Sequence, residues 1–167
     1  SREHTVLASR SGLITVTGGK WTTYRAMAEE VLQKCFTTGL LPEKPAGVTN
    51  QLPLVGTPRE PVQHRISDAQ GLHSYGSEAA EVRAMPGAQT DLGGGLTEAM
   101  VRFAARFEYA CTVEDVLARR SRLLFLDARK ALELAPVVAR ILREELGSDP
   151  QLDAFLALAP QYLHVPA

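Results

Sequence analysis

The stretch "TVTGGKWTTYR", residues 15–25, joins an apolar run to a helical pattern through two glycines and a lysine. Residues 13–17 are rich in β-branched side chains and are bounded by glycines, so they predict a short buried strand. From Trp21 to about Thr38 the apolar residues fall at helical spacing, and Gly39 stands where a helix C-cap is expected. The stretch therefore predicts a strand that turns directly into a helix.

Such a junction collects anions, because unpaired amide N–H groups and the helix dipole converge at the start of the helix. Gly18 and Gly19 permit close approach of the backbone, Lys20 adds a positive charge, and Thr22 and Thr23 supply hydroxyl groups. The spacing fits neither a P-loop nor the dinucleotide fingerprint. On spacing alone, a tight connection that binds nothing remains as good an interpretation as a ligand site.

Composition limits the kinds of partner that the chain can have. Its 167 residues are 45% apolar and 22% charged, which is ordinary for a soluble globular protein. The net charge of −1 provides no field that would attract nucleic acid, so we expect no nucleic-acid partner. No apolar stretch reaches the roughly 20 residues that span a bilayer. Cys35 and Cys111 are interpreted as reduced, small apolar fillers.

Prolines divide the chain. Five of them fall between residues 40 and 61, which predicts a linker over 40–60 between a strand–helix segment, 1–39, and an α-helical domain, 61–167. The fold class expected is mainly α. Helices are predicted over residues 62–69, 79–85, 97–109, 112–119 and 127–146, and from Pro150 onward.

Caps and stops mark several of these helices. Thr97 and Asp127 are predicted N-caps, Thr112 with Asp115 resembles a capping box, and Gly147 is a predicted stop.

Histidines show neither metal-ligand nor catalytic-triad spacing, and we expect no metal. The histidines concerned are His4, His64, His73 and His164.

The predicted strand over residues 13–17 lacks a visible partner. One strand cannot satisfy its backbone hydrogen bonds alone, so we expect it to pair across a homodimer or with a sheet outside this sequence. The chain opens with Ser1 rather than methionine, which favours a piece of a longer protein.

Two longer matches point to a family. "SREH" followed by "SGLITVTGGKWTTYRAMAEEVL" resembles the end of the flavin domain in FAD-dependent glycerol-3-phosphate dehydrogenases, where a strand ends in Gly-Gly-Lys and a Thr-Thr-Tyr-Arg helix follows. "EYACTVEDVLARRSRLLFLDA" resembles the C-terminal helical domain of the same family. The resemblance implies a C-terminal helical bundle preceded by a strand–helix remnant of an α/β FAD-binding domain.

The resemblance also implies an activity. The family oxidises glycerol 3-phosphate to dihydroxyacetone phosphate and passes electrons through FAD to a membrane quinone. No calcium-binding EF-hand loop is visible, so a bacterial-type parent is expected, cytoplasmic and peripheral to the inner membrane. Without the ADP-binding strand, the chain alone is expected to be inactive and to retain no FAD.

The family's site residues transfer to particular positions. Gly18, Gly19, Lys20, Trp21 and Thr22 are expected to lie against the flavin ring, where amides at a helix start would stabilise the electron-rich reduced form. Glycine is expected at positions 18 and 19 because a side chain at either position would push the flavin ring away.

The substrate phosphate is expected to meet Arg2 and Lys20, because a dianion needs cations of this type. No catalytic residue is assigned within this chain. His4 is a possible acid–base group, but the family's general base is expected in the missing N-terminal part.

Other interpretations stay open at this point. The chain could come from another FAD-dependent oxidoreductase of the glycine-oxidase-like superfamily, or it could be a non-catalytic helical interaction module. Arg119, Arg120 and Arg122 could touch lipid or a partner, but ion pairs with Glu114, Asp115 and Asp127 are the favoured interpretation.

Overall fold

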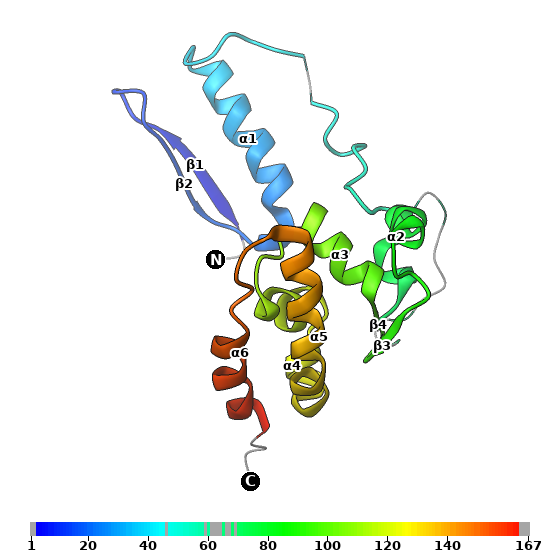
Figure 1. Ribbon diagram of the computed structural model, residues 1–167. Coiled ribbons are helices and arrows are strands. Elements are labelled where there is room, and N and C mark those ends of the chain that lie inside the picture. Colours follow the sequence, from blue (N-terminus) through cyan, green and yellow to red (C-terminus); the bar gives the residue numbers. More distant parts are fainter. Residues whose placement is uncertain are drawn as a thin grey trace. The chain divides into compact units, whose positions relative to one another are not determined.

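The chain forms two compact units, Ser1–Leu54 and Val55–Ala167, here called the N-terminal unit and the C-terminal unit. The computed structural model describes residues 3–45, 47–58, 60, 65, 68 and 70–163 (Figure 1). Helices dominate these residues, and the mainly α prediction is confirmed. The linker and domain bounds predicted from the prolines remain predictions.

The N-terminal unit begins with a β-hairpin. Strand β1 (His4–Ala8) pairs antiparallel with β2 (Ile14–Gly18), and Val6 lies opposite Val16. The prediction that the second strand must find a partner outside this chain is therefore wrong. The strand pairs with the five residues that precede a short turn, because backbone pairing requires only extended chain and a closing loop.

Helix α1 (Tyr24–Thr37) follows the hairpin through one 3₁₀ turn, η1 (Trp21–Thr23). Gly39 ends it in the left-handed region at φ 73°, and the amide of Leu40 donates to the carbonyl of Cys35 at 2.9 Å. The predicted C-terminal stop at Gly39 is confirmed.

The core of the molecule lies in the C-terminal unit. Its central elements are α3 (Glu98–Phe107) and α5 (Ala128–Leu146), and the latter continues through Pro136 without a break. No described residue of the N-terminal unit is buried, whereas the C-terminal unit buries a continuous apolar cluster. Its largest side chains are Phe103, Phe155, Leu117, Leu124, Ile141 and Leu142.

The predicted caps are confirmed. The hydroxyl of Thr97 accepts from the amide of Met100 at 3.3 Å, and Asp127 accepts from the amide of Lys130 at 3.0 Å. Asp115 and Thr112 cap each other reciprocally, with amide-to-side-chain distances of 2.9 and 3.1 Å.

The smaller elements of the C-terminal unit complete its chain order. They are η2 (Leu72–Glu78), α2 (Ala79–Ala84), β3 (Asp91–Gly93), β4 (Leu96–Thr97), a π-helical segment η3 (Asp115–Arg120), α4 (Leu123–Leu126), α6 (Leu152–Leu158) and η4 (Ala159–Leu163). The β3–β4 ribbon was not predicted. It forms where consecutive glycines permit a tight turn.

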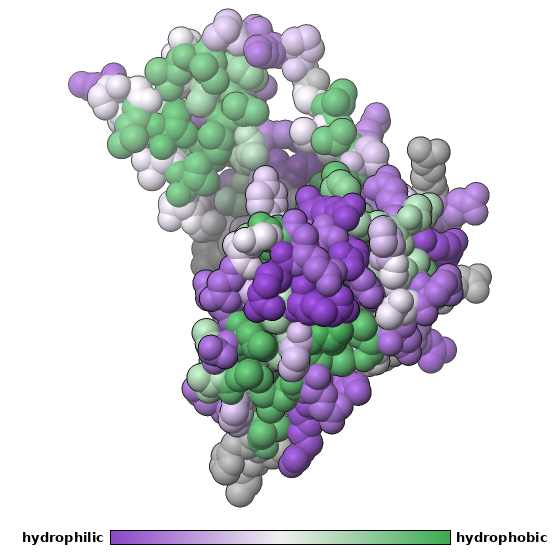
Figure 2. Space-filling view, in the orientation of Figure 1, coloured by the Kyte–Doolittle hydropathy of each residue, from purple (hydrophilic) through white to green (hydrophobic). Residues whose placement is uncertain are grey.

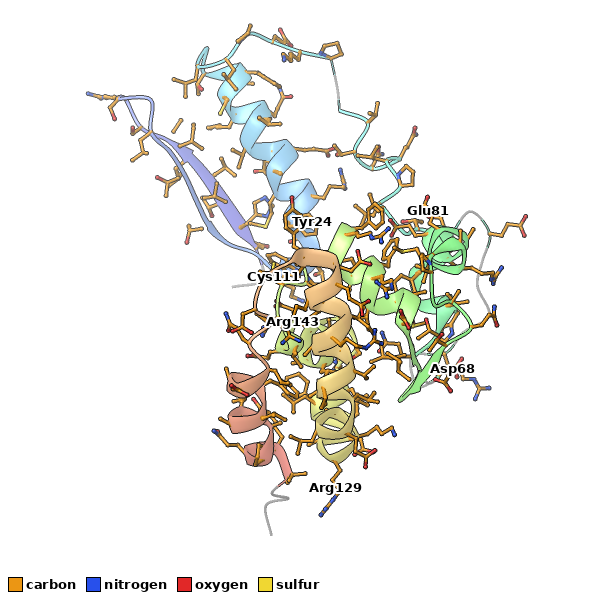
Figure 3. The ribbon with its side chains drawn as sticks, in the orientation of Figure 1. Tyr24, Asp68, Glu81, Cys111, Arg129 and Arg143 are labelled. Carbon is orange, nitrogen blue, oxygen red and sulfur yellow. The ribbon has the colours of Figure 1, made fainter. Side chains whose placement is uncertain are left out.

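Three details of the prediction need correction or lie outside the structure. The predicted helix over 62–69 falls mostly outside the described residues. Pro150 precedes the last helix rather than starting it, and its carbonyl accepts from the amide of Val113 at 2.9 Å. Cys111 is exposed rather than a core filler, because it lies in the polar loop before η3 (Figure 3).

Candidate functional site

The predicted site residues stand at the junction of β2 and α1. Gly18 is the last residue of β2, and both Gly18 and Gly19 adopt positive φ, at 78° and 83°. Lys20 returns to an extended conformation, and Trp21 and Thr22 form the first turn with Thr23. The structure thus places all five predicted cofactor residues in one continuous turn.

The glycines are required by contacts within the unit itself. A Cβ on Gly18 would lie 2.5 Å from the carbonyl oxygen of Glu3, and one on Gly19 would lie 2.6 Å from the sulfur of Met27. The amide of Gly19 is already used, since it donates to the Glu3 carbonyl at 3.1 Å. Close packing of the hairpin against α1 is therefore sufficient to explain both glycines.

Open hydrogen-bond donors lie one residue further along. Among the described residues, no acceptor pairs with the amides of Trp21 and Thr22, whereas the amide of Thr23 donates to the Lys20 carbonyl at 3.0 Å. The Lys20 side chain makes no ion pair with any described residue. Two amides and one ammonium group consequently remain available for an electron-rich partner.

Aromatic surface adjoins these donors. The indole of Trp21 is 86% exposed, and it stacks on the ring of Tyr24 with centroids 5.5 Å apart. Tyr24 stands at the start of α1 (Figure 3). An apolar ring beside open amides is suited to a flat, aromatic ligand with a polar edge.

The remaining predicted site groups are less complete. Arg2, the second predicted phosphate ligand, lies outside the described residues. The Nε2 atom of His4 lies 2.6 Å from the Oε2 atom of Glu30, so this imidazole is engaged within the unit. Among residues 3–163 that the structure describes, no group of three or more metal-ligating side chains comes together.

Apolar side chains are prominent on the surface of the N-terminal unit. Figure 2 shows hydrophobic residues gathered over the hairpin and α1. Leu7 and Leu13 are 57% and 65% exposed and belong to this apolar surface. The two-stranded sheet also leaves both of its outer edges unpaired within the described chain.

The arginine cluster of the C-terminal unit is held by ion pairs. Arg119 contacts Glu114 at 2.6 Å and Asp115 at 2.7 Å, while Arg120 donates to the backbone carbonyl of Glu108. The predicted ion pairs with Glu114 and Asp115 are confirmed for Arg119, whereas the acidic side chain nearest Arg120 is Glu108, which was not predicted, and Asp127 pairs with no arginine among the described residues. Arg122 makes no ion pair with a described residue.

Sequence patterns missed a larger network that joins α3 to α5. Arg102 contacts Glu144 at 2.8 Å and Glu145 at 2.6 Å, and it also pairs with Glu98. The hydrogen bonds that Arg102 donates to these carboxylates, the one to Glu145 foremost, raise the pKa of Arg102 above its usual range. Glu98 stands four residues before Arg102, a spacing visible in the sequence, but Glu144 and Glu145 lie more than 40 residues away, so no local spacing could have revealed them.

No described helix combines the length and the apolar character that crossing a bilayer demands.

Comparison with known proteins gives a consistent result. The family model for the C-terminal domain of alpha-glycerophosphate oxidase matches residues 13–152. A probable mitochondrial glycerol-3-phosphate dehydrogenase of Caenorhabditis elegans is 38% identical over 170 residues, which cover 88% of this chain and 23% of that protein. The human mitochondrial glycerol-3-phosphate dehydrogenase is 35% identical over 169 residues, covering 89% of this chain and 23% of that protein.

A plant relative agrees with them. The mitochondrial glycerol-3-phosphate dehydrogenase of Arabidopsis thaliana is 33% identical over 175 residues, covering 87% of this chain and 28% of that protein. The chain thus spans about a quarter of the length of the curated relatives it matches. No solved structure matches it significantly.

The names of these relatives overturn the expected location. All three are described as mitochondrial proteins, so the prediction of a cytoplasmic protein is wrong. The prediction rested on the absence of an EF-hand loop. Because the chain covers only part of its relatives, the absence of that loop from it does not indicate the source of the protein.

Proposed function

Because the chain belongs to the family of the C-terminal domain of alpha-glycerophosphate oxidase, we propose that it is part of an FAD-dependent enzyme that oxidises glycerol 3-phosphate. The chemistry that FAD supplies when bound is the acceptance of a hydride from the substrate. We further propose dihydroxyacetone phosphate as product and a quinone as the electron acceptor. The names of the relatives, all glycerol-3-phosphate dehydrogenases, support the choice of substrate.

In this proposal the turn after β2 contributes hydrogen bonds to the cofactor. The open amides of Trp21 and Thr22 would donate to the electron-rich edge of the flavin ring, and the exposed indole would border it. Amides at a helix start favour negative charge, which makes the bound flavin a better oxidant. This set of unused donors is the structural observation on which the proposed cofactor site depends.

Gly18 and Gly19 have a supporting role in the same site. They hold the turn against Glu3 and Met27, and so fix where the following amides point. Their contribution to the cofactor is therefore positional, through the conformation of the turn.

Lys20 is proposed to bind the phosphate of the substrate, together with Arg2. Its ammonium group is exposed and makes no ion pair with a described residue, so its charge is available to a dianion. We expect no general acid or base from this chain, since His4 is engaged by Glu30.

Further proposals concern the isolated chain and the longer protein. We propose that the isolated chain is inactive and retains no FAD, because it would supply few of the contacts needed for binding. Peripheral association with a membrane is proposed because a quinone resides in a bilayer. Homodimerisation through the open edge of the hairpin, and a bacterial source, remain predictions.

The test uses the longer protein that contains this chain. We expect a purified yellow protein with flavin absorbance, which reduces a quinone analogue when glycerol 3-phosphate is added. Bound flavin that is reduced only by a different substrate would favour another oxidoreductase of the superfamily. A longer protein that binds no flavin would contradict both enzyme proposals and would favour the interpretation of the chain as a helical interaction module.

Lys20→Met provides a site-specific test in the same protein. Removing the cation should raise KM for glycerol 3-phosphate about tenfold or more, because a charge-assisted hydrogen bond is lost. Lys34→Met, in the last turn of α1 and away from the predicted site residues in the sequence, is the matched control and should leave KM unchanged. Equal effects of the two substitutions on KM would show that Lys20 has no specific role in binding the substrate.

A further inference from the structure

A polar cavity of about 300 Å³ lies in the C-terminal unit, apart from the proposed flavin turn in the chain. Elements distant in sequence form its wall, including η2, the end of α3 and the end of the π-helical segment η3. Its lining residues are Val55, Gly56, Gln70, Ser74, Tyr75, Glu78, Glu108 and Arg120.

Two carboxylates and one guanidinium give this wall a net negative charge. Glu78 and Glu108 both line the cavity. Burial raises the pKa of Glu108, Arg120 lowers it by less, and Glu78 raises it by a still smaller amount. Arg120 therefore acts mainly on Glu108, and no cation among the described residues forms an ion pair with Glu78. The Nε atom of Arg120 donates to the Glu108 carbonyl at 3.1 Å and lies 3.8 Å from the Glu108 carboxylate.

Several polar groups on the η2 side remain unused. Among the described residues, the side chains of Ser74, Tyr75 and Glu78 have no hydrogen-bond partner. The Tyr75 ring is fixed edge-on against Phe103, with centroids 5.4 Å apart. Burial, with a smaller contribution from Glu108, raises the pKa of the Tyr75 hydroxyl, so this group stays neutral.

The walls are tied together by backbone contacts. The amide of Ser77 donates to the carbonyl of Gly56 at 3.1 Å, and a Cβ on Gly76 would lie only 1.9 Å from that oxygen. On the opposite side, the Gln70 side chain donates to the Arg120 carbonyl at 3.2 Å. These contacts connect the segments that line the cavity.

We propose that this cavity binds a small organic cation through a primary ammonium group. The carboxylates of Glu78 and Glu108 would accept its three N–H donors, and the Tyr75 ring would provide an aromatic surface for the charge. A bound cation would also relieve the repulsion between the carboxylates.

The size and ligand set of the cavity favour this class over a metal ion. A volume of about 300 Å³ accommodates several non-hydrogen atoms, and only two of the described side chains that line it are acidic. The described residues contain no group of three or more His, Cys, Asp or Glu arranged for a metal. An ammonium group needs only acceptors and charge, without a fixed coordination number.

Calorimetric titration of the longer protein with propylamine hydrochloride tests the proposal, and 1-propanol is the neutral match. We expect saturable binding of the amine, none of the alcohol, and no displacement by an equal concentration of potassium chloride. Glu78→Gln should weaken amine binding roughly tenfold, and Tyr75→Phe should weaken it less.

Glu133→Gln is the control, because Glu133 is 64% exposed and, within the described part of the chain, pairs only with Lys130. It should leave amine binding unchanged. Thermal unfolding of each variant confirms that the fold persists, and Glu78→Gln also keeps the shape of the side chain. Equal binding of amine and alcohol, displacement by potassium, or unchanged binding in Glu78→Gln would each overturn the proposal. None of these readouts depends on bound flavin.

Discussion

Asp115 shows how one side chain can organise a turn. Its carboxylate accepts from the amides of Cys111 and Thr112 and from the Thr112 hydroxyl, and it also contacts Arg119. Burial acts in the opposite direction, but these hydrogen bonds outweigh it and lower the pKa of Asp115 to about 2. The ionised form is therefore favoured in the folded state.

Replacing Asp115 with Ala should destabilise the C-terminal unit by about 1–2 kcal/mol, because the turn before η3 loses its cap. Urea unfolding followed by circular dichroism measures the loss. The contribution should be fully present above the ordinary aspartate pKa and should disappear as the pH falls toward 2, since the folded-state pKa is depressed. A variant whose deficit is the same at pH 7 and at pH 2 would contradict this assignment.

The first-turn donors were only partly predictable at the residue scale. The positions of Lys20, Trp21 and Thr22 followed from the chain order, because a helix start always leaves amides unpaired. The sequence could not show that the Gly19 amide donates a hydrogen bond to the Glu3 carbonyl, since that bond depends on the hairpin. The polar cavity was missed for a related reason, because its wall joins Glu78 to Arg120 across many residues.

Between elements, the pairing of α3 with α5 combines apolar packing with a charge network. The Arg102 side chain is 13% exposed and that of Glu145 is 8% exposed, so both groups have given up most of their hydration. Arg106 also contacts Glu145, at 2.6 Å, so two arginines compensate this carboxylate.

Arg102→Met should cost about 3 kcal/mol in the free energy of unfolding, because Glu98 would be left shielded from water without its arginine partner and Glu145 would keep only Arg106. Chemical denaturation provides the measurement. Arg140→Met is the control, since Arg140 pairs with Glu144 at the surface and its side chain is 51% exposed. A comparable loss in both variants would show that the network adds nothing to ordinary surface pairing.

Helix ends were the most predictable elements, and the hairpin and η3 were the least. Thr97, Asp127 and Gly147 act through hydrogen bonds or backbone angles within a few residues, so local sequence suffices. Strand β1 was missed because its residues carry little apolar alternation, and its pairing depends on β2. A π-helical segment has no local signature that distinguishes it from an α-helix.

At the scale of the whole molecule, the two units differ in how they are stabilised. The C-terminal unit has a continuous buried core, whereas the N-terminal unit has no buried residue among those described. Apolar residues of the hairpin, such as Leu13, remain largely exposed. The N-terminal unit therefore gains little free energy from burial on its own.

Hydrogen exchange on the isolated chain should reveal this difference. We expect amides of α5 to exchange only through global unfolding and amides of the β1–β2 hairpin to exchange at least about a hundredfold faster. Mass spectrometry of peptides from each unit provides the rates. Equal protection in the two units would mean that the hairpin is stabilised by something other than burial.

The reduction potential of the bound flavin tests the central proposal most directly, in the longer protein with Trp21→Pro compared with Trp21→Ala. Both variants remove the indole, but only proline removes the Trp21 amide hydrogen. Proline is accommodated at this first-turn position, because the preceding Lys20 is extended at φ −128° and ψ 151°.

If that amide hydrogen-bonds to the reduced flavin, its loss should cost about 1.5 kcal/mol and lower the two-electron potential by roughly 30 mV relative to Trp21→Ala. Identical potentials in the two variants would contradict the proposal that the helix start faces the flavin.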